Sequence, residues 1–202
     1  MELKPLNKEQ LEQVYYRHMK RAFPPNELKA LKVMEQMRDS GRYEPLGMYR
    51  DGQLLGYALM WLEPGVPFVL LDYLGTVEEE RGKGLGTTLL ALLGEYYAHM
   101  RGIFGEAERD NSPDPEERAL QHRRLDFYFR NGFRYAGYDC ALFGAHYETL
   151  IRDRGDVSGE ELLVIHTAMY KKQIPSPHYE RFIQLPLAPG EQARPAVAWR
   201  EE

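Results

Sequence analysis

The sequence has one cysteine and no long apolar run, and both features limit what kind of protein it encodes. Cys140 has no partner for an internal disulfide, which favours a reducing compartment, and we expect a cytoplasmic protein. No segment approaches the roughly 20 apolar residues of a membrane-spanning helix, and residues 1–11 lack the apolar core of a secretory signal. We therefore expect no membrane partner.

An excess of basic charge is also absent. Lys and Arg number 26 against 31 Asp and Glu, which gives a net charge of −5, so we expect no nucleic-acid partner. The 6 histidines show neither the HExxH spacing nor the Cys/His spacing of known metal sites. The sequence therefore predicts no metal site.

The composition is that of a folded protein, with 43% hydrophobic and 28% charged residues in 202 residues. We expect a single domain over residues 1–174, with its core at about residues 10–140. Prolines, glycine and charges dominate after Pro175, so residues 175–202 are expected to form a Pro-rich C-terminal tail.

Apolar periodicity and turn residues predict alternating helices and strands. A first helix opens with a capping box at Asn7 and Gln10 and ends before Pro24-Pro25. Further helices are expected at 26–39, 87–100, 116–129 and 158–171, and strands at 46–49, 54–61, 67–76, 103–108, 133–140 and 147–151. Asp51-Gly52 should turn the first two strands into a hairpin. This order of elements indicates a mixed α/β fold.

The most informative segment joins the strand ending at Thr76 to the helix at Thr87. Its glycines, Gly82, Gly84 and Gly86, occupy alternate positions where a helix begins, so unpaired N–H groups and the positive end of the helix dipole face the loop. Such a terminus binds phosphate without needing a side chain.

Two common phosphate-binding motifs do not fit. A P-loop needs Ser or Thr after Gly-Lys, but Lys83 is followed by Gly84. A dinucleotide fingerprint needs a third glycine, which is missing after Gly86. The spacing that fits is Arg81-x-x-Gly84-x-Gly86, and with it Tyr73–Thr88 resembles the acetyl-CoA-binding segment of the GNAT N-acetyltransferase superfamily.

A second segment, Leu125–Phe133, strengthens the resemblance, because it is similar to the family's later helix with an aromatic-Tyr pair and a terminal Gly-Phe. The resemblance implies a GNAT fold, with a mixed central sheet, a splayed strand and flanking helices. Two positions depart from the family pattern: Gln121 stands where Asn is common, and Thr76 where Val is usual.

The resemblance also implies the residues that bind acetyl-CoA as co-substrate. The strand end would bond the pantetheine arm through its backbone, and the turn and first helical residues would hold the pyrophosphate. These residues are Leu74, Gly75 and Thr76 on the strand, and Arg81, Gly82, Lys83, Gly84, Leu85, Gly86 and Thr87 on the turn.

For catalysis, the resemblance places Tyr128 beside the leaving thiolate, to which its phenol would donate a proton. Glu106, on the strand after the glycine-turn helix, is expected to act as base through water, with Asp72 and Glu63 as competing candidates. An amine that arrives with a lowered pKa needs no base at all.

The implied function is acetyl-CoA-dependent N-acetylation of a primary amine, on a small molecule or a protein, by direct attack in a ternary complex. The alternatives are a non-catalytic acyl-CoA-binding regulatory or scaffold domain, and a nucleotide-phosphate binder that uses the same loop. The identity of the acceptor and the presence of a homodimer are left open.

Overall fold

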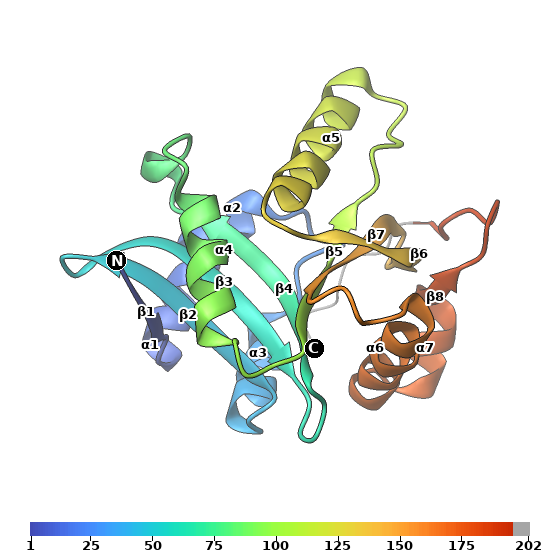
Figure 1. Cartoon of the computed structure of the whole chain (residues 1–202), viewed down its shortest axis with the longest axis horizontal. Helices are drawn as coiled ribbons and strands as arrows, with labels where there is room; N and C mark the ends of the chain where they lie inside the picture. Colours follow the sequence, from blue (N-terminus) through green and yellow to red (C-terminus); the bar gives the residue numbers. More distant parts are fainter. Residues whose placement is uncertain (196–202) are drawn as a thin grey trace. The chain divides into compact units, whose positions relative to one another are not determined.

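The computed structural model describes residues 1–195, which fall into two compact units (Figure 1). The first unit comprises Met1–Ile103 and the second begins at Phe104. Each unit combines strands with helices, which confirms the α/β fold class. The splay of a strand that the resemblance implies stays a prediction.

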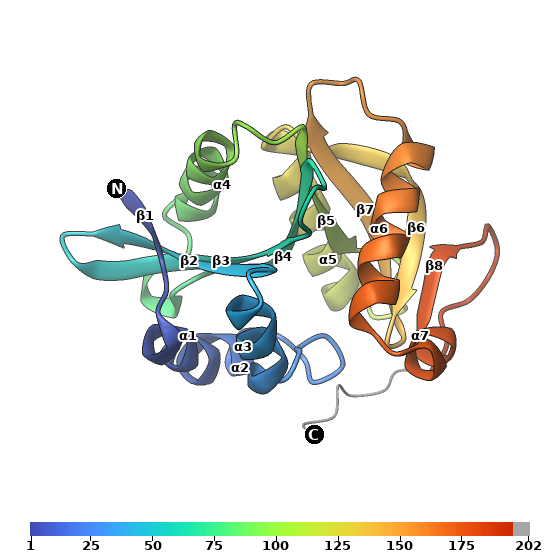
Figure 2. The same ribbon diagram turned by 90° about the horizontal axis from the view of Figure 1, so that it is seen from below.

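Unit 1 contains the predicted hairpin and the glycine-rich turn. Its elements are β1 (Glu2–Pro5), α1 (Lys8–Val14), the π-helical segment η1 (Tyr15–Met19), α2 (Lys20–Ala22), α3 (Leu31–Asp39), β2 (Tyr43–Arg50), β3 (Gln53–Leu62), β4 (Phe68–Thr76), the 3-10 turn η2 (Glu78–Glu80) and α4 (Leu85–Tyr96). The strands pair antiparallel in the order β1-β2-β3-β4. Helix α4 covers one face of this sheet, and α1, α2 and α3 cover the other (Figure 2).

Local sequence signals account for several boundaries in unit 1. The Asn7 side chain accepts from the Gln10 N–H and the Gln10 side chain accepts from the Asn7 N–H, which confirms the capping box that starts α1. Asp51 and Gly52 adopt φ values of 50° and 79°, as the turn between β2 and β3 requires. The large buried side chains of β3, Tyr57 and Trp61, then fill the unit's core.

Strand β4 is irregular where it pairs with β3. Leu59 lies opposite Tyr73, whereas the next residue, Met60, lies opposite Leu71. Asp72 is therefore an extra residue that forms a bulge in β4. The bulge lies just before Leu74–Thr76, the predicted cofactor-binding end of the strand, with only Tyr73 between them.

Unit 2 contains most of β5 (Gly102–Glu108), α5 (Pro115–Arg130), β6 (Arg134–Leu142), β7 (Ala145–Asp153), α6 (Gly159–Gln173), α7 (Ser176–Phe182) and β8 (Ile183–Leu187). Its strands follow the order β5-β7-β6-β8, and β6 pairs antiparallel with both neighbours. Helices α5 and α6 lie on opposite faces of these strands (Figure 1). Asp114 and Ser158 cap the two helices as acceptors for the N–H groups of Glu116 and Glu161.

One local expectation was wrong, and regular structure also occurs at two places where the sequence had not indicated it. The second helix begins at Leu31 and not at residue 26, because the carbonyl of Pro24 accepts from Glu27 and Leu28 N–H in a turn. The short strand β1 carries no apolar run that could have indicated it. The start of the expected tail is regular structure, since α7 and β8 occupy 176–187 and β8 pairs with β6. The division at residue 175 stays a prediction, and residues 196–202 of that tail lie outside the described residues.

Candidate active site

The glycine-rich turn connects η2 to α4, as the sequence predicted. Gly82 and Gly84 have φ values of 78° and 74°, in the left-handed region that side chains rarely adopt. No atom lies within 4 Å of the position that a Cβ would take at either residue. Backbone conformation, and not a lack of space, therefore requires glycine at these two positions.

The N-terminus of α4 is open to a ligand. Gly84 is the N-cap, and within the described chain no side chain caps this helix. The first-turn N–H groups of an α-helix have no acceptor within the helix, which here applies to Leu85, Gly86 and Thr87. Leu85 anchors the turn in the core, while Gly82–Gly84 are exposed. The turn thus presents unpaired amides and the positive end of a helix dipole, as a pyrophosphate requires.

Charged side chains surround this turn without closing it. Lys83 pairs with Glu80 at 3.0 Å, and Arg81 is exposed. The pKa of His18 on η1 is lowered chiefly by burial; nearby Glu79 acts to raise it, and the charge of Arg81 is among those that lower it. The acidic run before the turn is therefore partly neutralised by its own basic residues.

The strand end Leu74–Thr76 is partly exposed, unlike most of β4. It pairs with β3 through Ala58, Tyr57 and Gly56. Gly75 lies under the Tyr57 ring: a Cβ built on Gly75 would lie 2.4 Å from the Tyr57 hydroxyl oxygen. Gly75 is thus required by a close approach that sequence analysis did not identify.

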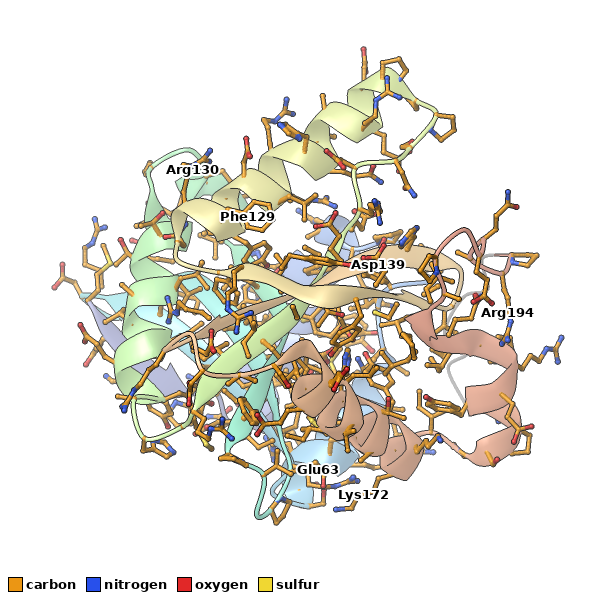
Figure 3. The ribbon with its side chains drawn as sticks, turned by 45° about the vertical axis from the view of Figure 1, so that its right-hand side comes forward. Glu63, Phe129, Arg130, Asp139, Lys172 and Arg194 are labelled. Carbon is orange, nitrogen blue, oxygen red and sulfur yellow. The ribbon has the colours of Figure 1, made fainter. Side chains whose placement is uncertain are left out.

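The two competing carboxylates of unit 1 are engaged in ion pairs. Asp72 lies 2.6 Å from the Lys29 ammonium, and the Tyr43 hydroxyl donates to its other oxygen. Glu63, labelled in Figure 3, lies 3.2 Å from the guanidinium of Arg42. Both carboxylates are nearly buried, so each serves as a structural partner of the cation beside it.

In unit 2, Tyr128 lies near the end of α5, between the rings of Phe127 and Phe133, each 5.3 Å away between centroids. Its side chain is partly buried, and no described residue hydrogen-bonds its hydroxyl. Burial raises the pKa of Tyr128 to about 12, against an opposing effect of Arg124. The group is therefore a neutral phenol with a proton to donate.

Glu106, on β5, takes part in a buried hydrogen-bond network that sequence analysis missed. Its Oε1 lies 2.8 Å from His166 Nε2 and accepts from the Tyr170 hydroxyl at 2.8 Å. His166 Nδ1 in turn lies 3.0 Å from the Tyr138 hydroxyl. The one available signal was the spacing of His166 and Tyr170 on the predicted helix, since residues four apart share a face.

Gln121, which stands where the family commonly has Asn, has a structural contact in unit 2. It is buried, and its side-chain oxygen accepts from the N–H of Ser112 at 3.1 Å. Arg130, labelled at the C-terminal end of α5 in Figure 3, is exposed and lies 3.9 Å from Asp126. The arginines of α5 are exposed.

Within residues 1–195, no group of at least three His, Cys, Asp or Glu side chains is arranged to hold a metal ion. In the same range, no helix has the length and apolar content needed to cross a bilayer.

Comparisons with known protein families and with solved structures both lead to GNAT acetyltransferases. A model of the Acetyltransferase (GNAT) family matches residues 9–133. A GNAT-family protein from Bacteroides thetaiotaomicron is similar in structure, with a TM-score of 0.67, 19% identity, and 86% of this chain and 98% of that chain covered. A comparison with curated proteins found no match.

Two enzymes with named acceptors are also similar in structure. The ribosomal-protein-S18-alanine N-acetyltransferase from Escherichia coli has a TM-score of 0.58 and 14% identity, covering 78% of this chain and 96% of its own. A spermidine N-acetyltransferase from Vibrio cholerae, solved with CoA and spermine, has a TM-score of 0.56 and 11% identity, covering 74% and 93%. At these identities the likeness shows the fold alone.

Proposed function

The chain belongs to the GNAT acetyltransferase family, and we propose that it transfers an acetyl group from acetyl-CoA to a primary amine by direct attack in a ternary complex. The observation that carries the proposal is the uncapped N-terminus of α4 behind the left-handed Gly84. A pyrophosphate fits this terminus because its oxygens accept hydrogen bonds from backbone N–H groups.

Binding of acetyl-CoA is assigned to unit 1. The pyrophosphate would be held by the turn from Arg81 to Thr87, with Arg81 and Lys83 adding positive charge. The backbone of Leu74–Thr76 would hydrogen-bond the pantetheine arm in the manner of an added strand. A backbone N–H near Leu74 would then polarise the thioester carbonyl, which is oxyanion-type stabilisation.

The reaction forms a carbon–nitrogen bond and breaks the carbon–sulfur bond of the thioester. The amine nitrogen attacks as the neutral species and loses one proton, and the leaving thiolate gains one. We propose Tyr128 as the donor to the thiolate, because its hydroxyl is protonated and has no partner among the described residues.

For the amine's proton we propose Glu106 as the base, acting through water. The hydrogen bonds from His166 and Tyr170 support this role because they fix the orientation of the carboxylate. Asp72 and Glu63 are less suited, since each is paired with a Lys or Arg side chain, whereas the partners of Glu106 are a histidine and a tyrosine.

A primary amine is the acceptor class that we propose. The named acceptors of the two similar enzymes, spermidine and the alanine of ribosomal protein S18, supply the first members of a test panel. A cytoplasmic location is part of the same proposal.

The test measures CoA affinity by calorimetry and thiol release with acetyl-CoA over a panel of polyamines, amino acids and peptides with a free amino terminus. We expect CoA binding and amine-dependent thiol release with at least one acceptor. Binding without release over the whole panel would favour the regulatory alternative. A folded chain without affinity for CoA would overturn the proposal, and better thermal protection by ATP or GTP would favour the nucleotide-binding alternative.

A further inference from the structure

Tyr57 of β3 extends across the neighbouring strand. It lies opposite Gly75 in the β3–β4 register, and its ring occupies the space above that glycine. The Cβ position of Gly75 is 2.3 Å from Tyr57 Cζ and 2.4 Å from the hydroxyl oxygen. Since neighbouring strands are about 4.8 Å apart, the hydroxyl is carried from β3 to a position directly over β4.

Within residues 1–195, the Tyr57 hydroxyl is a hydrogen-bond donor without an acceptor. The residue is fully buried, with an exposed fraction of 0%, and none of residues 1–195 is hydrogen-bonded to its hydroxyl. Burial raises its pKa to about 12, against the opposing charge of Arg81, so the proton stays on the oxygen at neutral pH. Among the described residues, the buried side-chain oxygen without a hydrogen-bond partner is Gln173 Oε1, so the Tyr57 hydroxyl oxygen keeps a small accessible surface through which a ligand can reach it.

The contacts of the Tyr57 ring account for an aromatic side chain at this position but not for its hydroxyl. The ring of His18 lies 6.2 Å from the Tyr57 ring between centroids. Phenylalanine would fill the same volume against His18 and Gly75, so packing alone does not require the oxygen. The oxygen lies at Gly75, where the proposed function places the pantetheine arm.

We propose that Tyr57 is a substrate-binding residue whose hydroxyl donates a hydrogen bond to an amide carbonyl of the pantetheine arm of acetyl-CoA. This inference rests on the proposed function and adds a side-chain contact to a strand end that otherwise binds through its backbone. Gly75 is then the residue that allows the contact, because any side chain there would displace the phenol.

The test compares Tyr57→Phe with wild type, using CoA and adenosine 3′,5′-bisphosphate, which lacks the pantetheine arm, as calorimetric probes. We expect the variant to bind CoA about 5- to 10-fold more weakly, as for one lost hydrogen bond. Its affinity for the bisphosphate and its melting temperature should match wild type. Tyr49→Phe on β2, at a tyrosine that is only partly buried, is the control and should change neither affinity.

Other outcomes contradict the inference in different ways. Unchanged CoA affinity in Tyr57→Phe would show that the hydroxyl makes no contact with the ligand. Equal weakening of CoA and the bisphosphate would place the effect at the phosphate end or in the fold. Absence of CoA binding by wild type would instead remove the proposed function itself, and is observed without any variant.

Discussion

The Lys29 ammonium lies 2.6 Å from the Asp72 carboxylate, and the two side chains are only 5% and 3% exposed. Asp72 is the bulged residue of β4, and Lys29 belongs to the connection before α3. The backbone N–H of Lys29 also donates to the Tyr73 hydroxyl at 2.9 Å, and that hydroxyl donates to the carbonyl of Glu27. Together these bonds hold the connection from α2 to α3 on β4.

Replacing Lys29 with Met should destabilise the protein by about 3–5 kcal/mol, because it leaves the buried Asp72 carboxylate without its cation. Urea unfolding measures the change. Lys4→Met removes an exposed pair with Glu2 and should cost at most about 0.5 kcal/mol. A Lys29→Met variant as stable as Lys4→Met would show that the pair contributes little to unit 1.

Gly84→Ala should weaken CoA binding at least ~10-fold, because strain at the N-cap turns the first amides of α4 away from the ligand. Gly52→Ala is the control, since Gly52 has a similar φ of 79° and equal space around its Cβ position. Both variants should lose about 1–2 kcal/mol of unfolding free energy, as expected for Ala in a left-handed conformation. Equal CoA affinity in the two variants would exclude the turn as the phosphate site.

Tyr128→Phe should lower kcat by about 100-fold and leave CoA affinity unchanged, because it removes the proton donor and keeps the ring. The pKa of about 12 adds a pH prediction: wild type should lose no activity through Tyr128 below pH ~11. Initial rates from pH 6 to 10 measure both effects.

Tyr135→Phe is the control for that experiment, since the Tyr135 hydroxyl is occupied by Asp139 at 2.8 Å. It should keep most of the wild-type kcat. If Tyr128→Phe retains a comparable rate, another group or the solvent protonates the thiolate.

The Asp153 carboxylate predicts a pH-dependent contribution to stability in unit 2. Burial alone would raise the pKa of Asp153, but hydrogen bonds from the Arg134 guanidinium and the Val157 N–H outweigh it, so the pKa lies below the ordinary 3.8. A depressed pKa stabilises the fold above pH 3.8, and this contribution disappears as the pH falls through the native value.

Asp153→Asn should therefore cost about 1–3 kcal/mol at pH 7, and the difference from wild type should shrink from about pH 4 to pH 2. Urea midpoints across this range measure the trend. Asp126→Asn, at an exposed pair with Arg130, should show no such trend. A constant difference between Asp153→Asn and wild type at all pH values would contradict the linkage.

Much of the site in unit 1 could be predicted because its cause is local. Gly82 and Gly84 determine the left-handed turn, and the amides of α4 are open because no side chain in the described part of the chain caps them. The role of Gly75 could not be predicted in the same way, because it depends on Tyr57, a residue of another strand. The cost of a Cβ at Gly75 exists only once β3 and β4 are in register.

By itself, the sequence determined the capped start of α1, the hairpin at Asp51-Gly52 and the glycine turn, since each depends on residues that are neighbours in the chain. Tertiary structure alone decided that Asp72 pairs with Lys29, that Glu106 meets His166, and that β8 joins β6. These contacts join residues far apart in sequence. Which residues become partners depends on which side chains the fold buries together, and a local pattern of residue types does not predict this.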